Sequence, residues 1–179
     1  MGTQRKRIVA RTVRITQDLD DLLRKDAEEK NTSVNALMYS ILTKYAEWDR
    51  FLEKLRFITI AEEAFRHILE LVEEEEDLTK ISSNLGARLP KEIAAFMFKQ
   101  INPKTLLELF SLYSKYSGLY KCEVEVKGEE RTIIYHHDLG VAWSYFLKHY
   151  IEEAIKTVGG FAPKSEITEN EVIVRFHAP

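Results

Sequence analysis

The chain has 179 residues, of which 45% are hydrophobic and 31% charged, with a formal net charge of −3. This composition excludes wholesale disorder, and the length suffices for one large or two small domains with a buried core. The single cysteine, Cys122, excludes an intrachain disulfide and a cysteine-based zinc finger. No apolar run suits a signal peptide or a membrane span, so we expect a cytoplasmic protein without membrane contact.

The charge is unevenly distributed along the chain. Residues 1–56 contain 12 Lys/Arg and 9 Asp/Glu, a balance of +3, whereas residues 57–179 contain 14 and 20, a balance of −6. We expect residues 1–10 to form a flexible basic arm. The first 14 residues hold no acidic side chain and five basic ones: Arg5, Lys6, Arg7, Arg11 and Arg14. This asymmetry favours an N-terminal part that binds a polyanion.

A short strand is predicted over residues 11–15. Alternation puts Val13 and Ile15 on one face and Thr12 and Arg14 on the other, which is the period of a half-buried strand. A lone strand leaves backbone N–H and C=O groups unpaired along both edges, and about 45 residues make too small a core. Pairing with the same strand of a second chain solves both problems.

Two amphipathic helices are predicted after the strand. Thr16 is placed to cap the first helix, whose apolar stripe is Leu19, Leu22, Leu23 and Ala27. Asn31 suits a left-handed turn, and Thr32 or Ser33 suits the cap of a second helix that continues to about Leu55. The inward positions of the second helix are Val34, Leu37, Met38, Ile41, Leu42, Tyr45 and Trp48.

In a two-fold symmetric dimer, the two strands form an antiparallel ribbon beside four helices. The expected dimer core is Val13, Ile15, Leu19, Leu22, Leu37 and Ile41. The opposite face of the ribbon then presents Thr12 and Arg14 twice. Such a ribbon fits the major groove of B-form DNA, where arginine binds guanine O6 and N7 and threonine contacts a base edge or a thymine methyl.

The segment "AEEKNTSVNALMY" and the strand before it resemble the ribbon-helix-helix (Arc/MetJ-like) family of DNA-binding domains over about residues 8–50. The resemblance implies a ribbon that reads bases with three residues: Ala10, Thr12 and Arg14. It also implies a phosphate site at the backbone amides that begin the second helix: Ser33, Val34 and Asn35. A helix N-terminus suits an anion, because its N–H groups are unpaired and carry partial positive charge.

The sequence departs from the family pattern at three positions. Ala10 stands where a polar base reader is usual, and Asn31 replaces the common glycine between the helices. Arg11 takes an inward position that is usually apolar, so we expect its side chain to turn outward to a phosphate.

The remainder of the chain is predicted to be a C-terminal α+β domain. Residues 56–60 are expected to be extended and to separate a DNA-binding domain, residues 11–55, from residues 56–179. An amphipathic helix is predicted over residues 61–76, and several helices precede a ββαβ segment. The whole chain is therefore predicted to be α+β.

Local signals place the C-terminal elements. Pro90 is predicted to lie near a helix start, and Asn102 with Pro103 to begin another helix. Alternation on both sides of Gly128 indicates a β-hairpin. Asp138 is placed to cap a helix that ends at Gly159-Gly160, and "EVIVRF" closes the chain as a strand.

We therefore predict a homodimeric, sequence-specific DNA-binding transcriptional regulator, prokaryotic and nucleoid-associated, with a repressor as the expected type. Two further possibilities stay open: that two dimers form a tetramer, and that the C-terminal domain binds a small-molecule effector. An antitoxin-type autoregulator that neutralises a protein partner is one alternative. Another is an enzyme or small-molecule binding protein in which the N-terminal part only dimerises. No Gly-rich phosphate loop or nucleophile elbow is present, so neither catalysis nor a cofactor is predicted.

A metal-responsive regulator is a further alternative, because His136 and His137 lie near Cys122 in the predicted hairpin. Neighbouring strand residues face opposite sides, so structural histidines are favoured over metal ligands. The many aromatic residues of the C-terminal domain are predicted to be core, with an aromatic-lined pocket or second dimer interface as alternatives. They are Phe96, Phe98, Phe110, Tyr113, Tyr116, Trp143, Tyr145, Phe146 and Tyr150.

Overall fold

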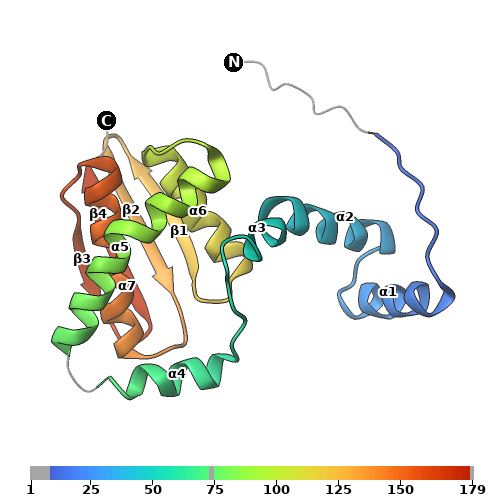
Figure 1. The fold of residues 1–179 in the computed structure, drawn as a ribbon, viewed down its shortest axis with the longest axis horizontal. Helices are drawn as coiled ribbons and strands as arrows, with labels where there is room; N and C mark the ends of the chain where they lie inside the picture. Colours follow the sequence, from blue (N-terminus) through green and yellow to red (C-terminus); the bar gives the residue numbers. More distant parts are fainter. Residues whose placement is uncertain (1–8, 73–74, 178–179) are drawn as a thin grey trace. The chain divides into compact units, whose positions relative to one another are not determined.

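The computed structural model describes residues 9–72 and 75–177. The chain divides into two compact units, Met1–Ala46 and Glu47–Pro179. The described residues combine helices with a four-stranded sheet, which confirms the α+β class (Figure 1). Three basic residues of the N-terminal part predicted to bind a polyanion lie outside the described residues: Arg5, Lys6 and Arg7.

The first unit contains two helices joined by a tight turn. Helix α1 spans Gln17–Glu29 and helix α2 spans Val34–Lys44. Asn31 has a φ of 49°, which is the left-handed conformation predicted for it. The Ser33 side chain caps α2, as predicted.

The segment before α1 forms no strand within the single chain. Residues 9–16 are exposed and without regular secondary structure. Because the predicted ribbon needs the same segment of a second chain, a single chain does not show it, and the ribbon stays a prediction. Thr16 stands at the N-cap position of α1, but its side chain makes no capping hydrogen bond, which differs from the expectation.

The helical run of α2 crosses the boundary between the two units. It continues through the π-helical turn η1, Tyr45–Asp49, into α3, Arg50–Leu52, close to the predicted end at Leu55. The units divide inside η1, between Ala46 and Glu47, whereas the sequence places the boundary at residues 56–60.

Aromatic packing explains the position of this boundary. Trp48 is buried, and its ring centroid lies 5.0 Å from that of Tyr113 and 5.8 Å from that of Phe57. Glu47 accepts hydrogen bonds from Lys115 Nζ at 2.8 Å and from the Tyr116 hydroxyl at 2.6 Å. The segment after Ala46 therefore belongs to the core of the second unit.

The second unit packs its helices on an antiparallel sheet. Its further elements are α4 (Glu62–Glu70), α5 (Glu75–Phe98), α6 (Pro103–Tyr116), β1 (Lys121–Lys127), β2 (Glu130–His136), α7 (Val141–Gly159), β3 (Lys164–Ile167) and β4 (Glu171–His177). The strand order is β1-β2-β4-β3, and every neighbouring pair is antiparallel. Helices α6 and α7 pack on the sheet, and α5 packs on α7 (Figure 1).

The main core lies between the sheet and these helices. Tyr135 in the central strand β2 is opposite Cys122 in β1 and Val172 in β4. Alternate residues of β2 and β4 are buried, which is the period-two pattern of a sheet covered on one face. The buried strand residues in the core are Ile133, Tyr135, Val172, Val174 and Phe176.

Several local predictions are confirmed. Asn102 and Thr105 form a reciprocal capping box at the start of α6, with Pro103 at the first helical position. The β1–β2 hairpin turns at Gly128, which has a φ of 62°, and α7 ends at a left-handed Gly160 with a φ of 69°. Strand β4 is also as predicted.

Three predictions on the C-terminal elements are wrong. The helix predicted over residues 61–76 ends at Glu70, and a new helix, α5, begins at Glu75. The carboxylates in the first turn of α5 interact favourably with the positive end of its helix dipole. Pro90 lies inside α5 rather than at a helix start. The N-cap of α7 is Gly140 rather than Asp138, and Leu139 between these two residues is buried in the core.

Helix α5 meets α7 through small side chains. Ser82, Gly86 and Pro90 are four residues apart, so they lie on one face of α5, and all three are buried. A Cβ atom at Gly86 would lie 2.8 Å from the Tyr150 Cα, which is too close for any other residue type. The close approach of α5 to α7 therefore depends on glycine, which has no side chain, at position 86.

His137 is a buried structural histidine at the end of β2. The Leu139 N–H donates to His137 Nδ1 at 3.4 Å, so Nε2 carries the proton and faces the Ser144 Oγ at 3.0 Å. Ser144 in turn donates to the Glu169 carbonyl at 3.2 Å. Burial lowers the pKa of His137 to about 4, because the charged ring loses its hydration.

This pKa predicts a loss of stability in mild acid. Between pH 6.5 and 4 the unfolded chain takes up a proton at His137 that the folded chain does not, so the unfolding free energy falls as the pH falls. The contribution approaches about 1.4 kcal/mol per pH unit, up to about 3 kcal/mol. Urea unfolding at pH 7, 5.5 and 4.5 measures it, with His137→Gln as the comparison. Parallel losses in both proteins would contradict it.

Candidate nucleic-acid interface and aromatic pocket

The predicted base-reading residues lie together in the segment before α1. Ala10, Thr12 and Arg14 are exposed, and so is Arg11. Their side chains are therefore accessible to a partner. Their pairing into a ribbon stays a prediction, because it needs a second chain.

The predicted phosphate site lies at the N-terminus of α2. The Ser33 Oγ accepts a hydrogen bond from the Ala36 N–H at 3.2 Å, so the hydroxyl is engaged as the helix cap. The amides of Val34 and Asn35 are in the first turn, where an α-helix provides no backbone acceptor. The Val34 side chain packs on the small core of the unit, while Asn35 is exposed.

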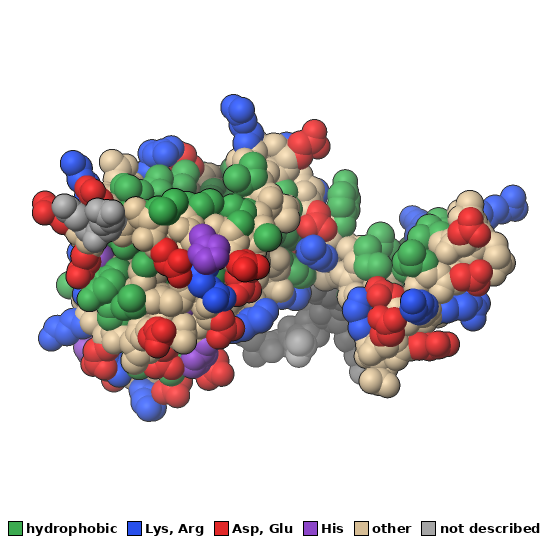
Figure 2. All heavy atoms as spheres, turned by 90° about the horizontal axis from the view of Figure 1, so that it is seen from below, with side chains coloured by type: hydrophobic (Ala, Val, Ile, Leu, Met, Phe, Trp, Pro, Cys, Tyr) green, Lys and Arg blue, Asp and Glu red, His purple; other side chains and the backbone are tan. Residues whose placement is uncertain are grey.

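The first unit exposes most of the side chains predicted to be its core. Among the described residues, its buried apolar side chains are Leu23, Ala27 and Leu37. Of the predicted dimer core, Leu37 is buried, whereas the exposed members are Val13, Ile15, Leu19, Leu22 and Ile41. Val13 is 66% exposed and Leu22 61%. On the right of Figure 2, where α1 and α2 lie, hydrophobic side chains reach the surface among charged ones.

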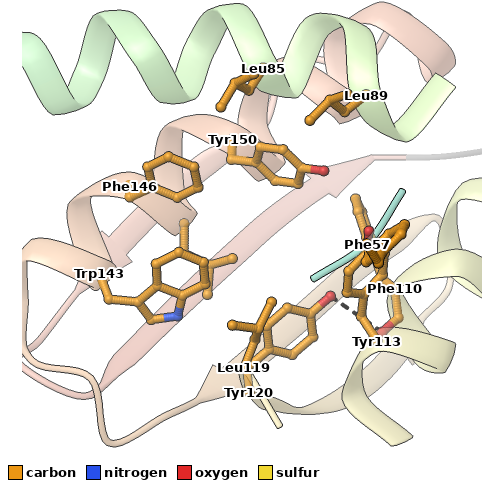
Figure 3. A pocket seen from close by; sticks show the side chains of 11 residues that line it. Phe57, Leu85, Leu89, Phe110, Tyr113, Leu119, Tyr120, Trp143, Phe146 and Tyr150 are labelled. Carbon is orange, nitrogen blue, oxygen red and sulfur yellow. Dashed lines mark hydrogen bonds between the residues drawn. The ribbon is translucent and has the colours of Figure 1, made fainter. Parts of the chain in front are cut away.

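The second unit contains an aromatic pocket of about 210 Å³. Helix α7 lines it with Trp143, Phe146, Leu147 and Tyr150, facing Leu85 and Leu89 of α5 (Figure 3). The remaining lining residues are Phe57, Phe110, Tyr113, Leu119 and Tyr120. The sequence predicts the aromatic residues of α6 and α7 as core, with a pocket as one alternative. It singles out neither Phe57, which lies in the predicted boundary segment, nor Tyr120.

The aromatic walls are ordered by stacking. The rings of Trp143 and Phe146 are nearly parallel, with centroids 5.0 Å apart and an angle of 10°, and Phe146 stacks on Tyr150 at 5.9 Å. The Tyr120 hydroxyl donates to the Phe110 carbonyl at 3.3 Å. Burial raises the pKa of both Tyr113 and Tyr150, so their hydroxyls stay neutral.

Among the described residues, those that line this pocket include no Asp, Glu, Lys, Arg or His. The lining is apolar apart from the tyrosine hydroxyls and the Trp143 indole N–H.

The histidines near Cys122 have other surroundings. Cys122 is opposite Tyr135 in the sheet, and His136 lies 3.2 Å from Glu171 through Nδ1. Within residues 9–72 and 75–177, no group of three or more His, Cys, Asp or Glu is arranged to hold a metal ion. In the same part of the chain, every helix is too short or too polar to cross a membrane.

No protein-family model matches this chain, and no curated protein matches it.

Proposed function

We propose that the chain is a homodimeric, site-specific DNA-binding regulator of transcription, of the ribbon-helix-helix type. The observation that carries the proposal is the exposed apolar stripe of the first unit beside an exposed, basic N-terminal segment. The second unit then acts as the effector-sensing or assembly part of the regulator. As a DNA-binding protein it works in the cytoplasm, on the nucleoid.

Dimerisation accounts for the exposed stripe. Monomeric proteins rarely leave so many apolar side chains in contact with water over so small a unit. Pairing residues 11–15 of two chains would cover Val13 and Ile15 on the inner ribbon face. The α1 and α2 helices of both chains would then cover Leu19, Leu22 and Ile41. Burial of each such side chain contributes about 1.5–3 kcal/mol.

DNA binding accounts for the outer face of the ribbon. With Val13 and Ile15 inside, Thr12 and Arg14 are outside, and the two-fold axis presents them to both halves of a pseudo-palindromic site. The amides of Val34 and Asn35 and the side chain of Arg11 supply phosphate contacts. Such contacts dominate affinity and weaken as salt concentration rises.

The direct test is selection of bound DNA from a random pool, followed by fluorescence anisotropy on the recovered site. Arg14→Ala is expected to cost about 1–3 kcal/mol, roughly 5- to 150-fold in Kd, because arginine binds guanine with two hydrogen bonds. Arg14→Lys should recover nonspecific affinity but not sequence preference, because lysine is a point charge.

The matched control is Arg88→Ala, which removes an exposed arginine that is paired with Glu92 in α5 of the second unit. Its DNA affinity is expected to equal that of the natural chain. If Arg14→Ala binds the selected site as tightly as the control, the residue does not read bases. If no sequence is enriched at all, the proposed function fails.

A further inference from the structure

We infer that the aromatic pocket of the second unit binds a small, neutral, planar aromatic molecule of one or two rings. As a binding site, this inference stands on the pocket alone. As the effector site of a DNA-binding regulator, it rests on the proposed function.

The volume of the pocket sets the size of the ligand. A cavity of about 150 Å³ lined by apolar side chains holds benzene. The pocket here measures about 210 Å³, which is enough for a substituted ring or for two fused rings. A long acyl chain or a nucleotide is too large.

The walls of the pocket favour a flat ligand. Trp143, Phe146 and Tyr150 recur at helical spacing along α7, so their rings form one continuous stacked wall. Leu85 and Leu89 of α5 lie next to Tyr150, and Leu119 and Tyr120 lie on the other side of the rings (Figure 3). A planar ring placed between these walls gains offset or edge contacts with the aromatic side chains.

The same lining excludes charged ligands. None of the lining residues in the part of the chain that the structure describes carries a formal charge, and the Tyr113 and Tyr150 hydroxyls stay neutral. A carboxylate or phosphate would lose its hydration without gaining a counter-charge. Metabolites that carry such groups on the buried part of the molecule are excluded.

The test titrates the full chain, without DNA, with two probes that share one ring system: naphthalene, which is neutral, and 2-naphthoate, which adds a carboxylate. Ligand-observed NMR at pH 7.5 measures both affinities. We expect naphthalene to bind at least about 10-fold more tightly than 2-naphthoate.

A variant tests the location. Leu85→Trp fills the pocket from α5 and is expected to weaken both probes at least 10-fold, with circular dichroism confirming the fold. The matched control is Leu71→Trp, since Leu71 is 79% exposed and lies outside the pocket lining.

No saturable binding of either probe to the natural chain would overturn the site, and binding unaltered by Leu85→Trp would place the probe elsewhere. Equal affinities for the two probes in the natural chain would overturn the exclusion of charged ligands. Because no DNA is present, these outcomes are separate from a failure of DNA recognition.

Discussion

Replacing Leu22 with glutamate is expected to dissociate the proposed dimer and to abolish tight DNA binding. Leu22 is 61% exposed in the single chain and belongs to the stripe that the dimer would cover. The substitution removes about 1.5–3 kcal/mol of favourable burial free energy from each chain, and it places a carboxylate in the apolar interface. By symmetry the loss occurs twice, so the dimer Kd should rise by at least about 100-fold.

Sedimentation equilibrium over a range of concentrations measures this effect. The control is Leu71→Glu, which makes the same change at an exposed position of the second unit and should leave the dimer intact. A natural chain that is monomeric at micromolar concentration would remove the basis of the ribbon. So would a Leu22→Glu variant that stays dimeric and binds DNA normally.

Replacing Gly86 with alanine is expected to destabilise the second unit, although alanine normally stabilises a helix by up to about 1 kcal/mol relative to glycine. The new Cβ would lie 2.8 Å from the Cα and 2.9 Å from the carbonyl carbon of Tyr150, which are backbone atoms of α7. The helices must separate to relieve the overlap. Overpacking of this kind costs about 1–3 kcal/mol, and Gly86→Val should cost more.

Thermal unfolding followed by circular dichroism measures this difference, and we expect a decrease in Tm of several degrees for alanine. The control is Asn84→Ala in the same helix, where the side chain is exposed and the change should be neutral or slightly stabilising. A Gly86→Ala variant with an unchanged or higher Tm would show that α5 does not depend on this close contact.

The sequence predicts those elements whose signals are local. The capping box at Asn102, the hairpin around Gly128 and the helix end at Gly160 each depend on a few adjacent residues, and each prediction is confirmed. Pro90 shows the opposite case. Proline normally breaks a helix, but Pro90 lies inside α5 on a buried face of small residues. This face packs on α7, which is distant in sequence, so no local signal predicts that the helix continues through the proline.

The candidate sites show the same distinction. Alternation over residues 11–15 indicates which side chains share a face, but their partner strand belongs to a second chain. The helical spacing of the aromatic residues of α7 predicts core positions, with a pocket as one alternative, and these residues pack in the core of the second unit. Phe57 is not predicted as either, because its position beside Tyr113 results from folding of distant segments.

The anchoring of Trp48 limits how the protein can be divided for study. A fragment that begins at Phe57 would lack the indole that packs on both Phe57 and Tyr113, and would expose to water two aromatic side chains that also line the pocket. A fragment intended to isolate the second half for crystallisation or ligand screening should therefore begin no later than Glu47, even though that cut passes through a helix.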